Sequence, residues 1–296
     1  MYEQISGNIW RSRLLLFLFL VILVGIGYVF SRAYNDPIIM PLAIVIATAM
    51  TVGGFYYSDK VVLMTTGARP ATREEFPHYV NSVEGLAIAA GLPCPRIYVM
   101  DDPAPNAFAT GRDPEHAIIC ATTGLLAMMD RVEVEGVIGH EMSHIKNYDI
   151  RFMMLVAVMA GSIALMADFF WRMRWFGGGR SRDDNGGGGQ AQAIFMIIGL
   201  VLAILAPISA ILVQAWISRK REYLADASGA MLTRYPDGLA SALEKIEADP
   251  NPLRSANKAT AHLFISNPLR DHGGGLNTLF DTHPPIEERV RRLKEM

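Results

Sequence analysis

The sequence has few of the features that mark secreted or nucleic-acid-binding proteins. It contains only two cysteines, Cys94 and Cys120, and they do not form a Cys-x-x-Cys pair. Two such cysteines cannot build the disulfide framework of a secreted domain, so a reducing compartment fits better. The 27 lysines and arginines are balanced by 29 aspartates and glutamates, which gives a formal net charge of −2. Because there is no basic excess and no basic stripe, the sequence excludes a nucleic-acid partner.

Charged residues are scarce as well, whereas hydrophobic residues are abundant. The two kinds make up 19% and 51% of the chain, and the mean hydropathy is +0.23. Soluble domains carry about 25% charged residues. Many of the hydrophobic residues fall into four long runs that polar sequence separates. The composition therefore predicts an integral membrane protein in which four hydrophobic segments accompany a water-facing domain.

The first two runs, residues 14–30 and 37–58, predict an N-terminal transmembrane hairpin over residues 1–58. As a helix the first run is about 26 Å long, close to the thickness of a bilayer core. A cleaved signal peptide is the alternative, but the run is long for that role. Because Arg11 and Arg13 precede the run, both ends of the hairpin are expected in the cytoplasm.

The last two runs, residues 152–171 and 193–217, predict a second hydrophobic hairpin over residues 152–217. The third run contains Asp168, which makes it weaker as a span. A glycine-rich loop with several arginines, residues 176–190, joins the two runs. Since those arginines oppose translocation of the loop, a shallow membrane-embedded hairpin stays open beside two full crossings.

The polar stretches, residues 59–151 and 218–296, predict the two parts of one α+β domain. The signals are a helix from about 72 to 91, a second helix around 239–248, and short strands at 96–100, 106–111 and 117–120. An open edge of such a small sheet could accept an extended peptide as an additional strand. A purely structural role also accounts for these strands.

The chemistry is concentrated in a His-Glu-x-x-His motif formed by His140, Glu141 and His144. Asp130 and Glu133 predict the start of the helix that carries it, as an N-cap and its capping-box partner. Positions four apart share a helix face, so both imidazoles point at one place. Two imidazoles with an adjacent carboxylate are typical of a catalytic zinc site. We predict one Zn²⁺ per chain, with His140 and His144 as ligands and Glu141 as the general base.

A third ligand is expected from a second helix directly after the fourth hydrophobic run. Glu222 and Asp226 lie four apart there, so they share a helix face. Zinc in hydrolases commonly takes a carboxylate as its third ligand, which assigns Glu222, and Asp226 could then accept the N–H of a ligand histidine. An ordinary surface helix, with Glu222 paired to Arg219 or Lys220, is the alternative. Both halves of the predicted site adjoin hydrophobic runs, so the site is expected near the bilayer surface.

Four motifs in this order resemble the HtpX family of membrane zinc metalloproteases: His140-Glu141-x-x-His144, Glu222-x-x-x-Asp226, Asn106-Ala107-Phe108-Ala109, and His283-Pro284-Pro285 followed by Arg289. The resemblance covers nearly the whole chain. It implies a mainly helical, gluzincin-type protease domain in the cytoplasmic (inner) membrane of a bacterium, with the active site facing the cytoplasm. It also implies that Asn106 belongs to a substrate-holding edge strand, and that His283 and Arg289 lie near the reacting carbonyl.

The function predicted from these observations is a zinc-dependent endopeptidase. Zinc would lower the pKa of its water towards about 7, while Glu141 would take the proton and pass it to the leaving amine. The resemblance implies that the partners are the lipid bilayer and damaged, misfolded or unfolded polypeptides, mainly membrane proteins, in proteolytic quality control during stress.

Two alternatives stay open. The chain could resemble the related CAAX prenyl proteases, which process lipid-modified C-termini but have more membrane segments than the four expected here. It could also be a zinc-binding membrane scaffold without turnover. Glu141 opposes the scaffold, because a structural zinc site closes its fourth position with a ligand and needs no base.

Overall fold

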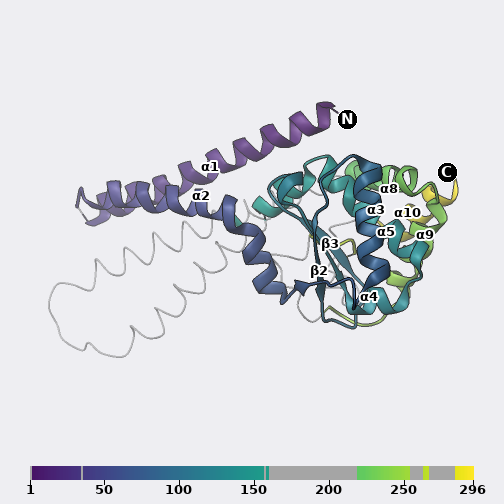
Figure 1. Ribbon diagram of the computed structural model, residues 1–296. Coiled ribbons are helices and arrows are strands. Elements are labelled where there is room, and N and C mark those ends of the chain that lie inside the picture. Colours follow the sequence, from purple (N-terminus) through teal and green to yellow (C-terminus); the bar gives the residue numbers. More distant parts are fainter. Residues whose placement is uncertain (1, 35, 157, 160–218, 254–262, 267–283) are drawn as a thin grey trace.

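The structure is a computed structural model that describes residues 2–34, 36–156, 158–159, 219–253, 263–266 and 284–296. It has two long helices, α1 (Tyr2–Tyr34) and α2 (Ile39–Thr66), which pair side by side and project from a globular body (Figure 1). The N-terminal end of α1 lies beside the body, whereas the turn between the helices lies far from it. α2 returns from that turn and leads into the body.

Both projecting helices are long and apolar enough to cross a membrane. The qualifying segments are Ile5–Gly25 and Met40–Thr66. Large apolar side chains on them are exposed, among them Phe17 at 61% and Val45 at 65%, as expected where lipid replaces water. α2 continues beyond residue 58, the expected end of the hairpin, to Thr66. Except for residues 152–156 and 158–159, the predicted second hairpin (152–217) lies outside the described residues, as does its glycine-rich loop.

The body contains a small mixed sheet of four strands. Its strands are β1 (Arg69–Pro70), β2 (Arg96–Met100), β3 (Ala107–Thr110) and β4 (Ile118–Thr122), in the order β1-β2-β4-β3. β2 and β4 are parallel, and the other two pairs are antiparallel. The three strands predicted from the sequence are thus confirmed. The sequence analysis missed β1, because a two-residue strand that includes a proline has no periodicity to detect.

Helices surround the sheet within the described residues. They are α3 (Pro77–Ala90), α4 (Thr123–Met128), α5 (Arg131–Lys146), α8 (Arg219–Thr233), α9 (Pro236–Ala248) and α10 (Ile286–Lys294), with a 3₁₀ turn, η1 (Pro114–His116), between β3 and β4. α3 and α9 begin at a proline, the residue favoured in a first helical turn. Gly91 follows the last residue of α3 and caps it in the left-handed conformation, with φ 68°.

The alternation of side chains along the strands divides the core into two clusters. On β4, Ile119 belongs to the cluster that includes α3, α5, α9 and α10, whereas its neighbour Cys120 belongs to the second cluster. The second cluster also contains Leu15 and Phe19 of α1 and Val62 of α2. The membrane helices therefore share buried apolar surface with the body.

Candidate metal centre

The site is built on α5, which is fixed at its start as predicted. The Asp130 side chain accepts a hydrogen bond from the Glu133 backbone N–H at 3.0 Å, and the Glu133 carboxylate accepts one from the Asp130 N–H at 2.9 Å. This confirms the predicted capping box. The Glu133 carboxylate also pairs with Lys245 of α9 at 2.6 Å. These contacts fix both the position of α5 and its rotation about its own axis.

Glycines allow the backbones of α8 and α5 to come into direct contact. A Cβ added to Gly229 of α8 would lie 2.8 Å from the backbone nitrogen of His140, and one added to Gly139 would lie 3.2 Å from the Gly229 carbonyl oxygen. Real Cβ atoms do not come as close as the first of these distances, so a side chain at Gly229 would push the helices apart. The close approach brings Glu222, on α8, to the two histidines of α5.

The three expected ligand side chains converge on one point. The two Nε2 atoms of His140 and His144 lie 3.1 Å apart, and the Glu222 carboxylate oxygens lie 3.7 Å and 3.6 Å from them. The ligand atoms are all within 4.8 Å of one another, and all three residues are buried. Zinc–nitrogen bonds of about 2.0–2.1 Å in a tetrahedral site place two nitrogens about 3.3 Å apart. The spacing therefore fits a small divalent cation.

The histidines are also oriented for metal binding, because each Nδ1 faces a carboxylate. The His140 Nδ1 lies 2.9 Å from Asp226 and the His144 Nδ1 lies 3.1 Å from Asp149. A hydrogen on each Nδ1 leaves a lone pair on each Nε2. In this tautomer a cation between the two Nε2 atoms would accept both lone pairs. The donor set thus fits the metal ion that the sequence predicted.

Asp226 is held in turn by Arg289 of α10. The guanidinium donates to both carboxylate oxygens, from Nε at 2.9 Å and from Nη2 at 2.7 Å. Burial raises the pKa of Asp226, but the charge and hydrogen bonds of Arg289 and the His140 hydrogen bond outweigh it and lower that pKa to about 2. Asp226 is therefore ionised at neutral pH. Arg289 is itself completely buried, and its Nη1 donates to the Ile265 carbonyl oxygen at 3.1 Å.

The second carboxylate, Asp149, was missed in the sequence analysis. It follows the end of α5, where helical spacing no longer predicts which side chains meet. Tyr148, just before it, has a positive φ of 60°, an uncommon conformation for a residue with a Cβ. This turn brings Asp149 back onto His144. A signal was present in the sequence, since an acidic residue shortly after a ligand histidine is a candidate partner for its second nitrogen.

Glu141 is buried beside the ligands. Burial, together with the negative charge of Glu222, raises its pKa to about 7, while His144, the Ala109 backbone and Arg289 act in the opposite direction. Burial also lowers the pKa of His140 to about 4. Burial lowers the pKa of His144 too, but the Asp149 hydrogen bond and the Glu222 charge outweigh it and raise that pKa to about 9. A carboxyl group with a pKa near 7 can both accept and release a proton at neutral pH.

Asn106 precedes β3, the strand at one edge of the sheet. Its side-chain amide donates to the Ser266 carbonyl oxygen at 3.1 Å, and its side-chain oxygen accepts from the Ala107 N–H at 3.0 Å. The Ala107 carbonyl accepts from the Ile265 N–H at 2.9 Å. This part of the β3 edge is thus paired with the chain itself. The substrate-binding roles expected for Asn106 and Arg289 stay predictions, and His283 lies outside the described residues.

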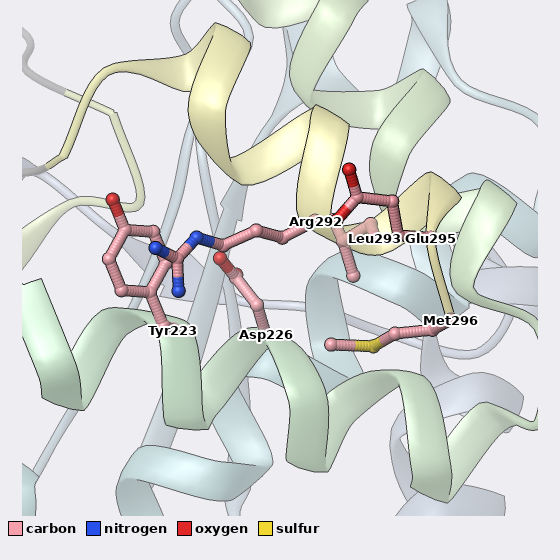
Figure 2. Close-up of a pocket in the computed structure, with 6 residues that line it drawn as sticks. All are labelled: Tyr223, Asp226, Arg292, Leu293, Glu295 and Met296. Carbon is pink, nitrogen blue, oxygen red and sulfur yellow. The ribbon is translucent and has the colours of Figure 1, made fainter.

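A pocket lies between α8 and α10, beside Asp226. Its lining includes Tyr223 and Asp226 of α8 and Arg292 of α10 (Figure 2). The Arg292 guanidinium stacks over the Tyr223 ring, with 3.9 Å between its central carbon and the ring centroid. This contact and the Asp226–Arg289 pair hold α10 against α8. The pocket is lined by Asp226 but not by His140, His144 or Glu222, so it belongs to this helix packing.

Comparison with known proteins identifies the family. The model of peptidase family M48 matches residues 74–296. The chain is 50% identical to the protease HtpX homolog of Caldanaerobacter subterraneus subsp. tengcongensis, over all of this chain and 98% of that protein. It is 47% identical to the protease HtpX homolog of Dictyoglomus thermophilum, over all of this chain and 94% of that protein.

A solved structure shares the fold. The crystal structure of S. mikatae Ste24p aligns with 96% of this chain and 66% of its own, with a TM-score of 0.52 and 18% identity. At this identity the likeness concerns the fold. The family match, the full-length HtpX relatives and the two apolar helices agree with the buried His140, His144 and Glu222 cluster. The chain therefore belongs to peptidase family M48, among the HtpX membrane metalloproteases of bacteria.

Proposed function

We propose that the metal is one Zn²⁺ held by His140, His144 and Glu222, and that Glu141 is the general base of peptide-bond hydrolysis. The observation that carries the proposal is the convergence of the two Nε2 atoms and the Glu222 carboxylate, with Glu141 buried beside them. When bound there, zinc supplies Lewis-acid chemistry, which acidifies water and polarises the scissile carbonyl.

The protein's own groups handle the proton. The Glu141 carboxylate takes a proton from the attacking water as the water oxygen bonds to the carbonyl carbon. The same carboxyl group then delivers this proton to the amide nitrogen, so the carbon–nitrogen bond breaks and a neutral amine leaves. Asp226 and Asp149 hold the imidazoles in the tautomer whose Nε2 lone pair faces inward.

We also propose that the body faces the cytoplasm of a bacterial cell, at the inner membrane, and that its substrates are damaged or misfolded membrane proteins. Arg11 and Arg13 precede the apolar run 14–30, which supports a cytoplasmic N-terminus. The contact between the start of α1 and the body supports a site close to the bilayer surface. The remaining hydrophobic runs, residues 152–171 and 193–217, would complete four segments.

The test is cleavage of an unfolded model protein by the purified, zinc-loaded chain in detergent, beside the Glu141→Gln variant. Glu141→Gln has nearly the same shape but cannot accept the proton. We expect the variant to retain its zinc and to lose at least about 10³-fold in kcat, since the base is used at both proton transfers. Equal cleavage by both forms at matched zinc content would contradict the assignment of Glu141.

The ligand set is tested separately by zinc content. Glu222→Ala removes one of three protein ligands, so we expect zinc to be lost during dialysis against a weak chelator. Glu244→Ala changes an exposed glutamate that pairs with Lys294 at the surface and serves as the matched control. Zinc content equal to that of the unchanged protein in Glu222→Ala would remove Glu222 from the ligand set.

A further inference from the structure

The first turns of α1 reach the turn that follows α5. The Asn8 side-chain amide donates one hydrogen to the Asn147 carbonyl oxygen at 2.9 Å and the other to the Asp149 carboxylate at 2.7 Å. Asn8 is 4% exposed, and both partners are buried as well. Both hydrogens of the amide are therefore used, on either side of Tyr148. A buried amide with two such bonds specifies one geometry, because moving the helix would leave polar groups unsatisfied.

The bond from Asn8 continues to the proposed metal ligand. Asp149 uses its Oδ1 for Asn8 and its Oδ2 for the Nδ1 of His144, at 3.1 Å. Because each oxygen has its own donor, the carboxylate is fixed in rotation. The orientation of the His144 ring thus depends on a residue of the N-terminal helix, 141 positions before Asp149 in the chain.

The length of α1 explains how a membrane helix can make this contact. Its 33 residues extend for about 50 Å, whereas the hydrocarbon core of a bilayer is about 30 Å thick. Asn8 precedes Arg11 and Arg13, and the uncharged run begins only after them, at residue 14. The start of α1 lies beside the body (Figure 1), where Asn8 contacts the turn after α5.

We propose that Asn8 is a positioning residue for the metal site, which acts on His144 through Asp149 and makes the first membrane helix part of the support of the metal. The proposal rests on the proposed role of His144 as a ligand. It predicts that metal binding weakens when the Asn8 amide is removed, although Asn8 does not contact the metal. It also predicts that this effect requires Asp149.

The experiment measures metal affinity in the full chain in detergent. Zinc dissociation constants are obtained by competition with a chelator, and the absorption spectrum of the Co²⁺-loaded protein reports ligand geometry. The variants are Asn8→Ala, Asp149→Asn and the double variant. Ser12→Ala is the matched control, since Ser12 is equally buried one turn later on α1 and its hydroxyl donates to the Asn8 carbonyl within the helix.

We expect Asn8→Ala to weaken zinc binding by about tenfold and to shift the Co²⁺ spectrum, because partners that orient ligand histidines contribute about 10- to 100-fold in affinity. Ser12→Ala should change neither. In the Asp149→Asn background, Asn8→Ala should add less than about twofold, since the two residues act in series. Asn8→Asp keeps the size of the side chain but removes both hydrogens, so it should weaken binding at least as much as Asn8→Ala.

Three results would overturn the inference. The first is unchanged zinc affinity and an unchanged Co²⁺ spectrum in both Asn8 variants while Asp149→Asn weakens binding. The second is an effect of Asn8→Ala that is fully additive with Asp149→Asn, which would indicate a general loss of packing. The third is that the unchanged protein binds no zinc at this site, and this result would overturn the proposed function at the same time.

Discussion

The two proposed histidine ligands sit one turn apart on the same helix, yet they are supported in different ways. His140 is backed by Asp226, which forms a buried ion pair with Arg289 of the C-terminal helix α10. His144 is backed by Asp149, which accepts from the neutral amide of Asn8 on the membrane helix α1. One support lies within the body, and the other reaches the membrane segment.

This difference predicts that the two histidines depend on different parts of the protein. A buried carboxylate that loses a cationic partner loses charge compensation, which is very costly, whereas a carboxylate that loses a neutral donor loses one hydrogen bond. Disrupting the support of His140 should therefore lower the free energy of unfolding of the whole body. The His144 side should respond to the position of α1 while the body stays folded. Three experiments test this comparison.

The largest effect is expected for Arg289→Met on the His140 side. The variant removes the guanidinium that donates to both Asp226 oxygens but keeps much of the apolar volume of the side chain. We expect a loss of about 3–5 kcal/mol in the free energy of unfolding, because the Asp226 carboxylate stays buried without its partner. Denaturant unfolding in detergent measures it. A loss below about 1 kcal/mol would show that the pair does not anchor this side.

An intermediate effect is expected from pH. The pKa of Asp226 is lowered to about 2 in the folded protein, whereas an unfolded aspartate has a pKa of about 3.9. The carboxylate therefore contributes stability that is complete above about pH 5 and is lost as the pH falls towards 2, about 2–3 kcal/mol in total. Asp226→Asn should lack this part of the acid dependence. Parallel stability curves for the two proteins between pH 5 and pH 2 would contradict this prediction.

The smallest effect on folding is expected for Asp149→Asn on the His144 side. An amide has one acceptor oxygen where Asp149 uses two, so either His144 or Asn8 loses its partner. We expect zinc binding to weaken by about 10- to 100-fold, while the free energy of unfolding changes by only about 1 kcal/mol. Chelator competition and denaturant unfolding of the same preparation check both. A loss of stability as large as that of Arg289→Met would remove the contrast between the two sides.

The sequence predicted how side chains are arranged within a single helix or strand. It did not predict which side chains of distant elements contact one another. The capping box of Asp130 and Glu133 and the shared face of His140 and His144 follow from spacing within one helix. The three longer strands follow from runs of β-forming residues. Nothing in local spacing, however, places Asn8 beside Asp149 or Arg289 against Asp226.

The backbone explains part of what was missed. Asp149 reaches His144 only because Tyr148 takes a positive φ, and a tyrosine carries no signal for that conformation. Glu222 reaches the histidines because Gly139 and Gly229 let the two helices touch. A glycine in a helix predicts flexibility or close packing equally well, so its partner becomes known only in the folded chain.

The groups of this site are widely separated along the chain, which bears on the order in which the protein becomes complete. His140 and Asp226 are 86 positions apart, and Asp226 and Arg289 a further 63. Proteins rich in contacts between residues so distant fold slowly, and synthesis proceeds from the N-terminus. A growing chain thus carries the His-Glu-x-x-His helix long before it carries Glu222 or Arg289. The proposed metal site and its supports can therefore be complete only after both Glu222 and Arg289 have been synthesised.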